Sequence, residues 1–284
     1  FLDHLAGTPL APEVREAMRP FLEEGFGNPG SLHGRGLAAR EALEKARVQC
    51  AQLIHAAPED ILFTSSGTEA NNLAVKGVAF AQRERGNHIV LSNIEHPSVD
   101  RGVAWLEENG FTATRVGVDN EGRVAPDDVA LAITDQTILI ATHHASHDLG
   151  TVQAVEAIGA IAAERGVPLL IDATASGGGL PIDVQASNIS LLSLAPHRFS
   201  GPQGVGVLYR NRRVPLTPLL HGGVQEDGLR AGTENIPAII GAGAAALLSL
   251  PDVAPLQRKL HEGLMERLEL IHLNGPKPGA ERLP

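Results

Sequence analysis

Small and polar residues follow the apolar segment 61–64, at a point where a helix is expected to begin. The sequence there is Ser66-Gly67-Thr68. A glycine-bearing turn at a helix N-terminus exposes unpaired N–H groups and the positive end of the helix dipole, which suits a phosphate. Ordinary N-capping by Ser66 or Thr68 explains the same residues. The turn therefore predicts either an anion site or a helix cap.

Residues able to do chemistry also follow other apolar segments. His96 comes after the segment 88–93, Asp172 closes the apolar segment 168–172, and His197 with Arg198 follows the segment 189–194. A carboxylate after a buried strand is costly unless it is paired, and a protonated pyridine nitrogen is one suitable partner. His96 is either a ring that stacks on a planar cofactor or a surface histidine.

The segments that must position these residues alternate between strand and helix. Short β-branched segments are followed by amphipathic, helix-length stretches, and this order predicts a mostly parallel sheet with helices on both faces. In such sheets ligands bind beyond the carboxyl ends of the strands. The predicted strands are 60–65, 88–93, 112–118, 137–142, 168–172, 189–194 and 204–209, and the predicted helices are 37–57, 69–83, 98–109, 154–165, 236–248 and 255–271.

The composition excludes several classes of protein. A formal net charge of -10 argues against a nucleic-acid partner. No apolar run of about eighteen residues is present, so we expect no membrane span. The one cysteine, Cys50, allows no disulfide within the chain and indicates a reducing compartment, which we take to be the cytoplasm. Cys50 lies within a predicted helix and is expected to be a buried structural thiol.

The chain resembles the cysteine desulfurases, the NifS-like members of the class V aminotransferases. The matching residues extend over nearly the whole sequence and include Asn28-Pro29, Thr68-Glu69-Ala70-Asn71-Asn72, Glu95-His96, Asp172-Ala173-Thr174, Gly201-Pro202-Gln203-Gly204 and Arg230-Ala231-Gly232-Thr233. The resemblance implies an α/β fold, namely the large domain of the fold-type I transferases that depend on pyridoxal phosphate (PLP). That domain has a mostly parallel seven-stranded sheet flanked by helices.

The resemblance also implies a role for each matching residue. Ser66, Gly67 and Thr68 would hold the cofactor phosphate, with His197 beside it. His96 would stack on the pyridine ring, and Asp172 would pair with its nitrogen. His147 and Ala175 stand at two further cofactor-contacting positions. Thr233 would reach the phosphate in the other subunit of a homodimer.

The pattern departs from the family at its central position, where the lysine that forms the Schiff base is replaced by Arg198. A Schiff base needs an amine that can lose its proton, and a guanidinium stays charged, so arginine cannot take over this role. The four lysines are Lys45, Lys76, Lys259 and Lys277, and none follows a predicted strand. His147 stands in place of an asparagine, Ala175 of a glutamine, Ala195 of a serine and His4 of another polar residue.

Three functions follow from this pattern. The first is a cysteine desulfurase relative serving sulfur mobilisation or iron–sulfur cluster assembly, with PLP held non-covalently or absent, and with a scaffold or sulfur-acceptor protein as partner. The second is a non-catalytic scaffold or partner subunit. The third is an enzyme built around a histidine-rich pocket, in which His96, His144, His147 and His197 are candidate metal ligands.

The resemblance also divides the chain. Residues 1–250 would form the large domain, and residues 251–284 would begin a connecting helix and a small C-terminal domain that is incomplete. The family's sulfur-carrying cysteine and substrate-binding arginine would belong to a region beyond residue 284.

Overall fold

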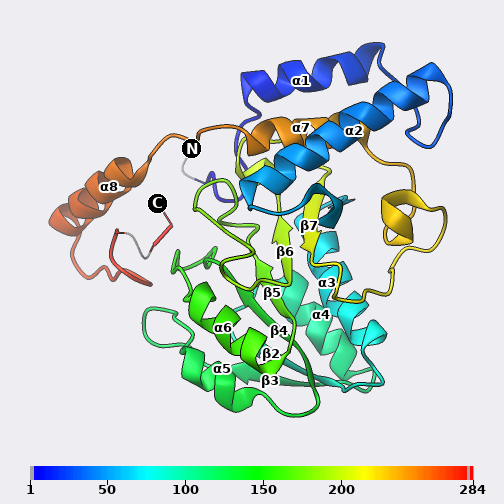
Figure 1. Cartoon of the computed structure of the whole chain (residues 1–284). Coiled ribbons are helices and arrows are strands. Elements are labelled where there is room, and N and C mark those ends of the chain that lie inside the picture. The colour runs from blue at the N-terminus through cyan, green and yellow to red at the C-terminus, as the bar shows by residue number, and fades with distance from the viewer. Residues whose placement is uncertain (1–2, 280–281, 284) are drawn as a thin grey trace.

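The computed structural model describes residues 3–279 and 282–283, which form one seven-stranded sheet with helices around it (Figure 1). The strands are β1 (Ile61–Thr64), β2 (His88–Ser92), β3 (Thr112–Val116), β4 (Thr137–His143), β5 (Leu169–Asp172), β6 (Leu191–Leu194) and β7 (Gly206–Arg210). The α-helices are α1 (Pro12–Glu23), α2 (Gly34–Leu53), α3 (Gly67–Ala81), α4 (Pro97–Glu107), α5 (Pro126–Ala132), α6 (Val155–Arg165), α7 (Ile236–Ala246) and α8 (Ala254–Arg267), with 3-10 turns η1 (Pro58–Asp60), η2 (Pro196–Arg198) and η3 (Gln225–Gly228).

The strand order brings several carboxyl ends to one edge of the sheet. The order is β1-β7-β6-β5-β4-β2-β3, and only β7 runs antiparallel to its neighbours, β1 and β6. Because β1 and β6 both pair antiparallel with β7, they run in the same direction as β2, β4 and β5. The residues that follow these five strands therefore lie along the same edge, which confirms the mostly parallel sheet predicted from the sequence.

Two apolar layers cover the two faces of the sheet. One contains the inward residues of α1, α2, α5, α6 and α7, and the other contains those of α3 and α4. Successive strand residues alternate between them: Leu169 and Ile171 belong to the first layer and Leu170 to the second. This alternation is the period-2 geometry of a strand that is buried on both sides. Figure 1 shows α3 and α4 on the opposite side of the sheet from α5 and α6.

The sequence prediction found the seven strands but omitted α1 and α5. Helix α1 contains Pro20, which removes a backbone donor, and proline inside a helical pattern normally indicates a break. Helix α5 is only seven residues long. Helix α2 begins three residues before the predicted start, because the side chain of His33 caps it by accepting from the N–H of Gly36.

Helix α8 lies at the end of the described chain, apart from the sheet (Figure 1). None of its residues is buried, and Leu256, Leu260 and Leu264 expose much of their surface. The division at residue 250 stays a prediction, and residues 280, 281 and 284 of the second segment lie outside the described residues. Within the described ranges no helix has both the length and the apolar character needed to cross a membrane.

Candidate functional site

Asp172, the last residue of β5, is a buried and hydrogen-bonded carboxylate at this edge of the sheet. It is 3% exposed and accepts three hydrogen bonds. The backbone N–H of Thr174 (2.9 Å) and the hydroxyl of Ser193 (3.2 Å) bind Oδ1, and Nδ2 of Asn71 on α3 binds Oδ2 (2.9 Å). These donors hold the carboxylate in a fixed orientation. The structure therefore provides at Asp172 a buried, oriented carboxylate suited to a cationic partner.

The first turn of α3 follows β1 at the same edge. Ser66 is the N-cap residue, and its hydroxyl accepts from the N–H of Glu69 (3.1 Å). The N–H groups of Gly67 and Thr68 have no acceptor within the helix, as at any helix N-terminus. A Cβ at Gly67 would lie 2.6 Å from the methyl group of Thr174, so only glycine allows this approach of α3 to the end of β5. The turn is thus both a helix cap and a candidate anion cradle.

Glu69 places a negative charge in this same turn, and a second loop offsets it. The Nε of Arg230 donates to Glu69 Oε1 (3.0 Å), and the N–H of Ser65 donates to Oε2 (2.8 Å). Thr233 lines a cavity of about 210 Å³ together with Ser65 and Arg230. The structure thus brings Thr233 to the end of β1 within its own chain.

His96 caps α4 beyond the end of β2. Its Nδ1 accepts from the N–H of Ser98 (3.1 Å) and lies 2.7 Å from the Ser98 hydroxyl. The rings of His96 and His147 meet edge to face, with centroids 5.1 Å apart. Burial lowers the pKa of His96, and the charge of Asp172 opposes this effect. Two of the predicted residues, His96 and His147, are therefore neighbours in the fold.

Arg198 ends the η2 turn that follows β6. Its half-buried guanidinium interacts electrostatically with Asp172 and with Asp3, while burial lowers its pKa. Its Nε is buried and is one of four buried side-chain N or O atoms in the described part of the chain that have no hydrogen-bond partner. The preceding His197 accepts at its carbonyl from the N–H and hydroxyl of Thr8 (2.8 and 3.0 Å). The structure therefore places a half-buried cation in the turn that follows β6.

Ala195 and Ala175, two of the positions expected to depart from the family, also belong to this edge. Ala195 is buried at the end of β6, and its Cβ would lie 3.4 Å from a Cβ added at Gly67. Ala175 lies in the turn that follows Asp172. Neither side chain can donate a hydrogen bond to a ligand.

The histidines proposed as metal ligands do not gather. Nδ1 of His144 is 2.9 Å from the hydroxyl of Ser176, and Nε2 of His147 is 3.5 Å from Asp148 Oδ2. No three histidine, cysteine, aspartate or glutamate side chains within residues 3–279 and 282–283 are placed to hold a metal ion. For these residues the structure therefore gives no support to the alternative in which His96, His144, His147 and His197 hold a metal.

A buried network around His143 went unnoticed in the sequence. Nδ1 of His143 lies 2.9 Å from Glu95 Oε1, which also accepts from the His143 N–H (3.1 Å). The Gln153 amide is fixed, because its oxygen accepts from the N–H of Val124 and its nitrogen donates to the Gly122 carbonyl. Its nitrogen therefore faces Nε2 of His143 (3.1 Å) as a donor, which fits a ring that carries its proton on Nδ1. The glutamate directly before His96 was the available signal.

His144 should make the stability of the fold depend on pH. Burial lowers its pKa to about 4, whereas an unfolded histidine titrates near 6.5. Between these values the unfolded chain binds the proton and the folded chain does not, so acid favours unfolding. We expect this residue to remove about 2 kcal/mol of unfolding free energy between pH 7 and pH 5.

Urea denaturation at both pH values, with His144→Asn as the matched variant, measures this effect. Asparagine retains a partner for Ser176 but does not titrate. The unfolding free energy of the variant should therefore fall less between pH 7 and pH 5 than that of the unaltered protein, by about 2 kcal/mol. An equal loss in both proteins would show that His144 is not the responsible group.

The thiol of Cys50 lacks the exposure and the lowered pKa that are typical of a reactive cysteine. It is 2% exposed, and burial raises its pKa to about 12. The thiolate, which is the nucleophilic form, is therefore scarce at neutral pH.

The residues at the strand ends suit the non-covalent contacts of a pyridine-type cofactor, but they do not supply the amine for a covalent Schiff base. Asp172 is ready for a ring nitrogen, and the first turn of α3 offers N–H groups to a phosphate. At the end of β6 the residue that follows His197 is Arg198, whose side chain is a guanidinium and not an amine. Lys45, Lys76 and Lys259 lie within α2, α3 and α8, and the Lys76 ammonium rests on the Trp105 ring at 4.5 Å from its centroid.

Comparison with known proteins assigns this fold to a family. The class-V aminotransferase family matches residues 1–276. Cysteine desulfurase IscS of Methanosarcina thermophila is 45% identical over 281 residues, or 97% of this chain and 70% of that protein. Its counterpart in Dictyoglomus turgidum is 43% identical, over 100% of this chain and 73% of that protein.

Solved structures agree with this assignment. A structure of SspA in complex with cysteine superimposes with a TM-score of 0.91 and 37% identity, covering 97% of this chain and 81% of that one. A NifS-like protein gives a TM-score of 0.88 and 35% identity, covering 93% and 73%. The large-domain fold of the PLP-dependent fold-type I transferases is thereby confirmed. This chain belongs to the class-V aminotransferase family, a PLP-dependent family in which it is similar to the cysteine desulfurases.

Proposed function

We propose that this protein is a cysteine desulfurase relative that serves sulfur mobilisation or iron–sulfur cluster assembly without holding PLP covalently. The observation that carries the proposal is Arg198, which stands in the η2 turn that follows β6. Identities of 40–45% to cysteine desulfurases support the link to sulfur chemistry. Arg198 is assigned to the Schiff-base position because it directly follows His197, as the lysine follows the histidine in the resemblance.

Where PLP binds, the chain's own residues would hold it. The N–H groups of Gly67 and Thr68 with the Ser66 and Thr68 hydroxyls would take the phosphate, His96 would cover the ring, and Asp172 would accept from its nitrogen. PLP when bound supplies an electron sink. Arg198 cannot release a proton to act as the nucleophilic amine, so these residues bind and orient the group without attaching it.

The proposal extends to assembly and to partners. We infer a homodimer in which Thr233 also reaches the partner's site, a sulfur-acceptor or scaffold protein as further partner, and the cytoplasm as location. The related cysteine desulfurases support the partners. A single cysteine, buried and without a disulfide, supports a reducing compartment.

Native mass spectrometry after incubation with PLP and then with borohydride tests this proposal. We expect a native mass of twice the chain, and a denatured mass equal to the bare chain, because nothing joins the cofactor to a side chain. The cysteine desulfurase of Methanosarcina thermophila, treated in parallel, shows whether the procedure detects covalent PLP. A borohydride-stable PLP adduct on this chain would contradict the proposal.

A further inference from the structure

The turn at Glu226 lies outside the strand-end edge and is held by a buried ion pair and by backbone hydrogen bonds. We propose that the ion pair between Glu226 and Arg47 is a clamp that holds the loop 224–233, so that Arg230 stays against Glu69 in the first turn of α3. The consequence for anion binding by that turn rests on the function proposed above. The clamp itself depends only on the contacts of the loop.

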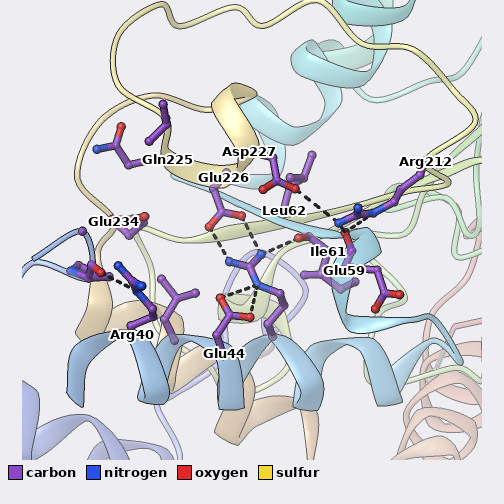
Figure 2. A pocket seen from close by; sticks show the side chains of 15 residues that line it. Arg40, Glu44, Glu59, Ile61, Leu62, Arg212, Gln225, Glu226, Asp227 and Glu234 are labelled. Carbon is purple, nitrogen blue, oxygen red and sulfur yellow. Dashed lines mark hydrogen bonds and ion pairs between the residues drawn. The ribbon is translucent and has the colours of Figure 1, made fainter. Parts of the chain in front are cut away.

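Glu226 (Figure 2) and Arg47 both line a cavity of about 420 Å³. Arg47 on α2 donates from both terminal nitrogens to the two carboxylate oxygens of Glu226, each at 2.8 Å. Oε2 of Glu226 also accepts from the N–H of Phe63 on β1 (2.9 Å). The side chain of Glu226 is 1% exposed and that of Arg47 11%. Such a carboxylate stays buried only because it is paired and hydrogen-bonded.

The backbone of this turn is held in an unfavourable conformation. Glu226 has φ 48° and ψ 51°, and Asp227 has φ 56° and ψ 29°, so two consecutive residues with side chains are left-handed. Residues other than glycine persist in this region only where surrounding contacts over-determine it. The clamp fixes Glu226, and a longer contact of Asp227 with Arg212 (3.5 Å) lies on the outer side. The strain and the clamp therefore belong together.

The turn is connected to the rest of the loop by hydrogen bonds. The N–H of Leu229 donates to the carbonyl of Glu226 (3.0 Å), and that of Gly228 to the carbonyl of Val224 (3.1 Å). The side chain of Gln225 accepts from the N–H of Gly232 (3.1 Å). Arg230 lies in the sequence between Leu229 and Gly232, whose N–H groups donate two of these hydrogen bonds. Releasing Glu226 would thus loosen both sides of Arg230.

Arg230 offsets the negative charge of Glu69 in the first turn of α3. Its guanidinium binds Glu69, which otherwise would present an unbalanced carboxylate where an anion is to bind. A negative charge there repels an incoming phosphate. The clamp does not touch the candidate anion cradle in the first turn of α3. It acts indirectly, by holding the loop that keeps Arg230 against Glu69.

Hydrogen exchange of the full-length chain tests the clamp directly. In Glu226→Ala the amides of Gly228, Leu229 and Gly232 should exchange at least about tenfold faster, because truncation removes the buried carboxylate that binds both terminal nitrogens of Arg47 and leaves only the exposed Glu44, among the described residues, as its ion-pair partner. Glu226→Gly also removes the clamp but adopts positive φ without steric cost, so its amides should exchange more slowly than those of the alanine variant. Glu107→Ala, which removes an exposed partner of Arg115, should leave all three amides unchanged.

Unchanged exchange in Glu226→Ala would overturn the clamp. Should that variant fail to fold, Arg47→Lys provides the same readout, since lysine keeps the charge but loses the two-pronged geometry. Unchanged exchange in that variant would overturn the clamp as well.

Equilibrium dialysis against PLP separates the clamp from the proposed function. Glu226→Ala should bind PLP several-fold more weakly, and Arg230→Gln should reproduce the loss with no further effect from adding Glu226→Ala. Faster exchange with unchanged PLP affinity would retain the clamp and refute the cradle. Unchanged exchange in Glu226→Ala, in a protein that binds PLP, would refute the clamp and retain the anion cradle.

Discussion

Arg198→Lys should convert this chain into one that carries PLP covalently after borohydride reduction, while cysteine desulfurase turnover stays at least about a hundredfold below that of the Methanosarcina thermophila relative. Lysine can lose its proton in a half-buried site and attack the cofactor aldehyde, which a guanidinium cannot do. Ala175 and His147 would still stand where hydrogen-bonding partners of the ring are expected. Attachment should therefore return without efficient turnover.

Intact-mass analysis and sulfide release from cysteine measure the two parts of this result. Arg198→Gln is the matched control, because it removes the guanidinium without supplying an amine, and it should give no adduct. High turnover from Arg198→Lys alone would show that Ala175 and His147 are neutral substitutions. An adduct on the glutamine variant would place the reactive nitrogen elsewhere in the chain.

Asp172→Ala should cost about 3 kcal/mol of unfolding free energy. The change leaves the N–H of Thr174, the Ser193 hydroxyl and the Asn71 amide without their acceptor. It also removes a negative charge that acts electrostatically on the half-buried guanidinium of Arg198. Asp172→Asn should cost less, since its oxygen still accepts from Thr174 and Ser193. The unpaired Oδ1 of Asn71 can turn toward the new amide. Both variants should lose PLP affinity.

Urea denaturation gives the two free energies, and Asp100→Ala is the control. Asp100 pairs with Arg115 at 2.8 Å but its side chain is 43% exposed, so its removal should cost less than about 1 kcal/mol. If Asp172→Ala were no more destabilising than Asp100→Ala, the hydrogen bonds around Asp172 would not contribute to the fold.

Local pattern was enough to predict the sheet and most of the residues along its edge. The seven apolar segments, Gly67 before a helix, and Asp172 after a buried strand all follow from short-range rules of burial and helix geometry. Helix α1 was missed because Pro20 opposes a helical pattern, and the contacts of α1 with α7 that stabilise it join residues more than two hundred positions apart. Such contacts leave no local signal.

For the candidate site, too, some features follow from the sequence and others only from the tertiary structure. The absence of a lysine after His197 is a statement about residue types, so the sequence determined by itself that this position lacks an amine. Only the tertiary structure decided which histidines meet: His96 and His147 do, whereas His144 turns to Ser176 and His143 to Glu95. It alone joined Glu226 to Arg47 across the fold. Covalent reactivity depends on the residue itself, but pairing depends on which side chains the packed sheet and helices bring within a few ångströms.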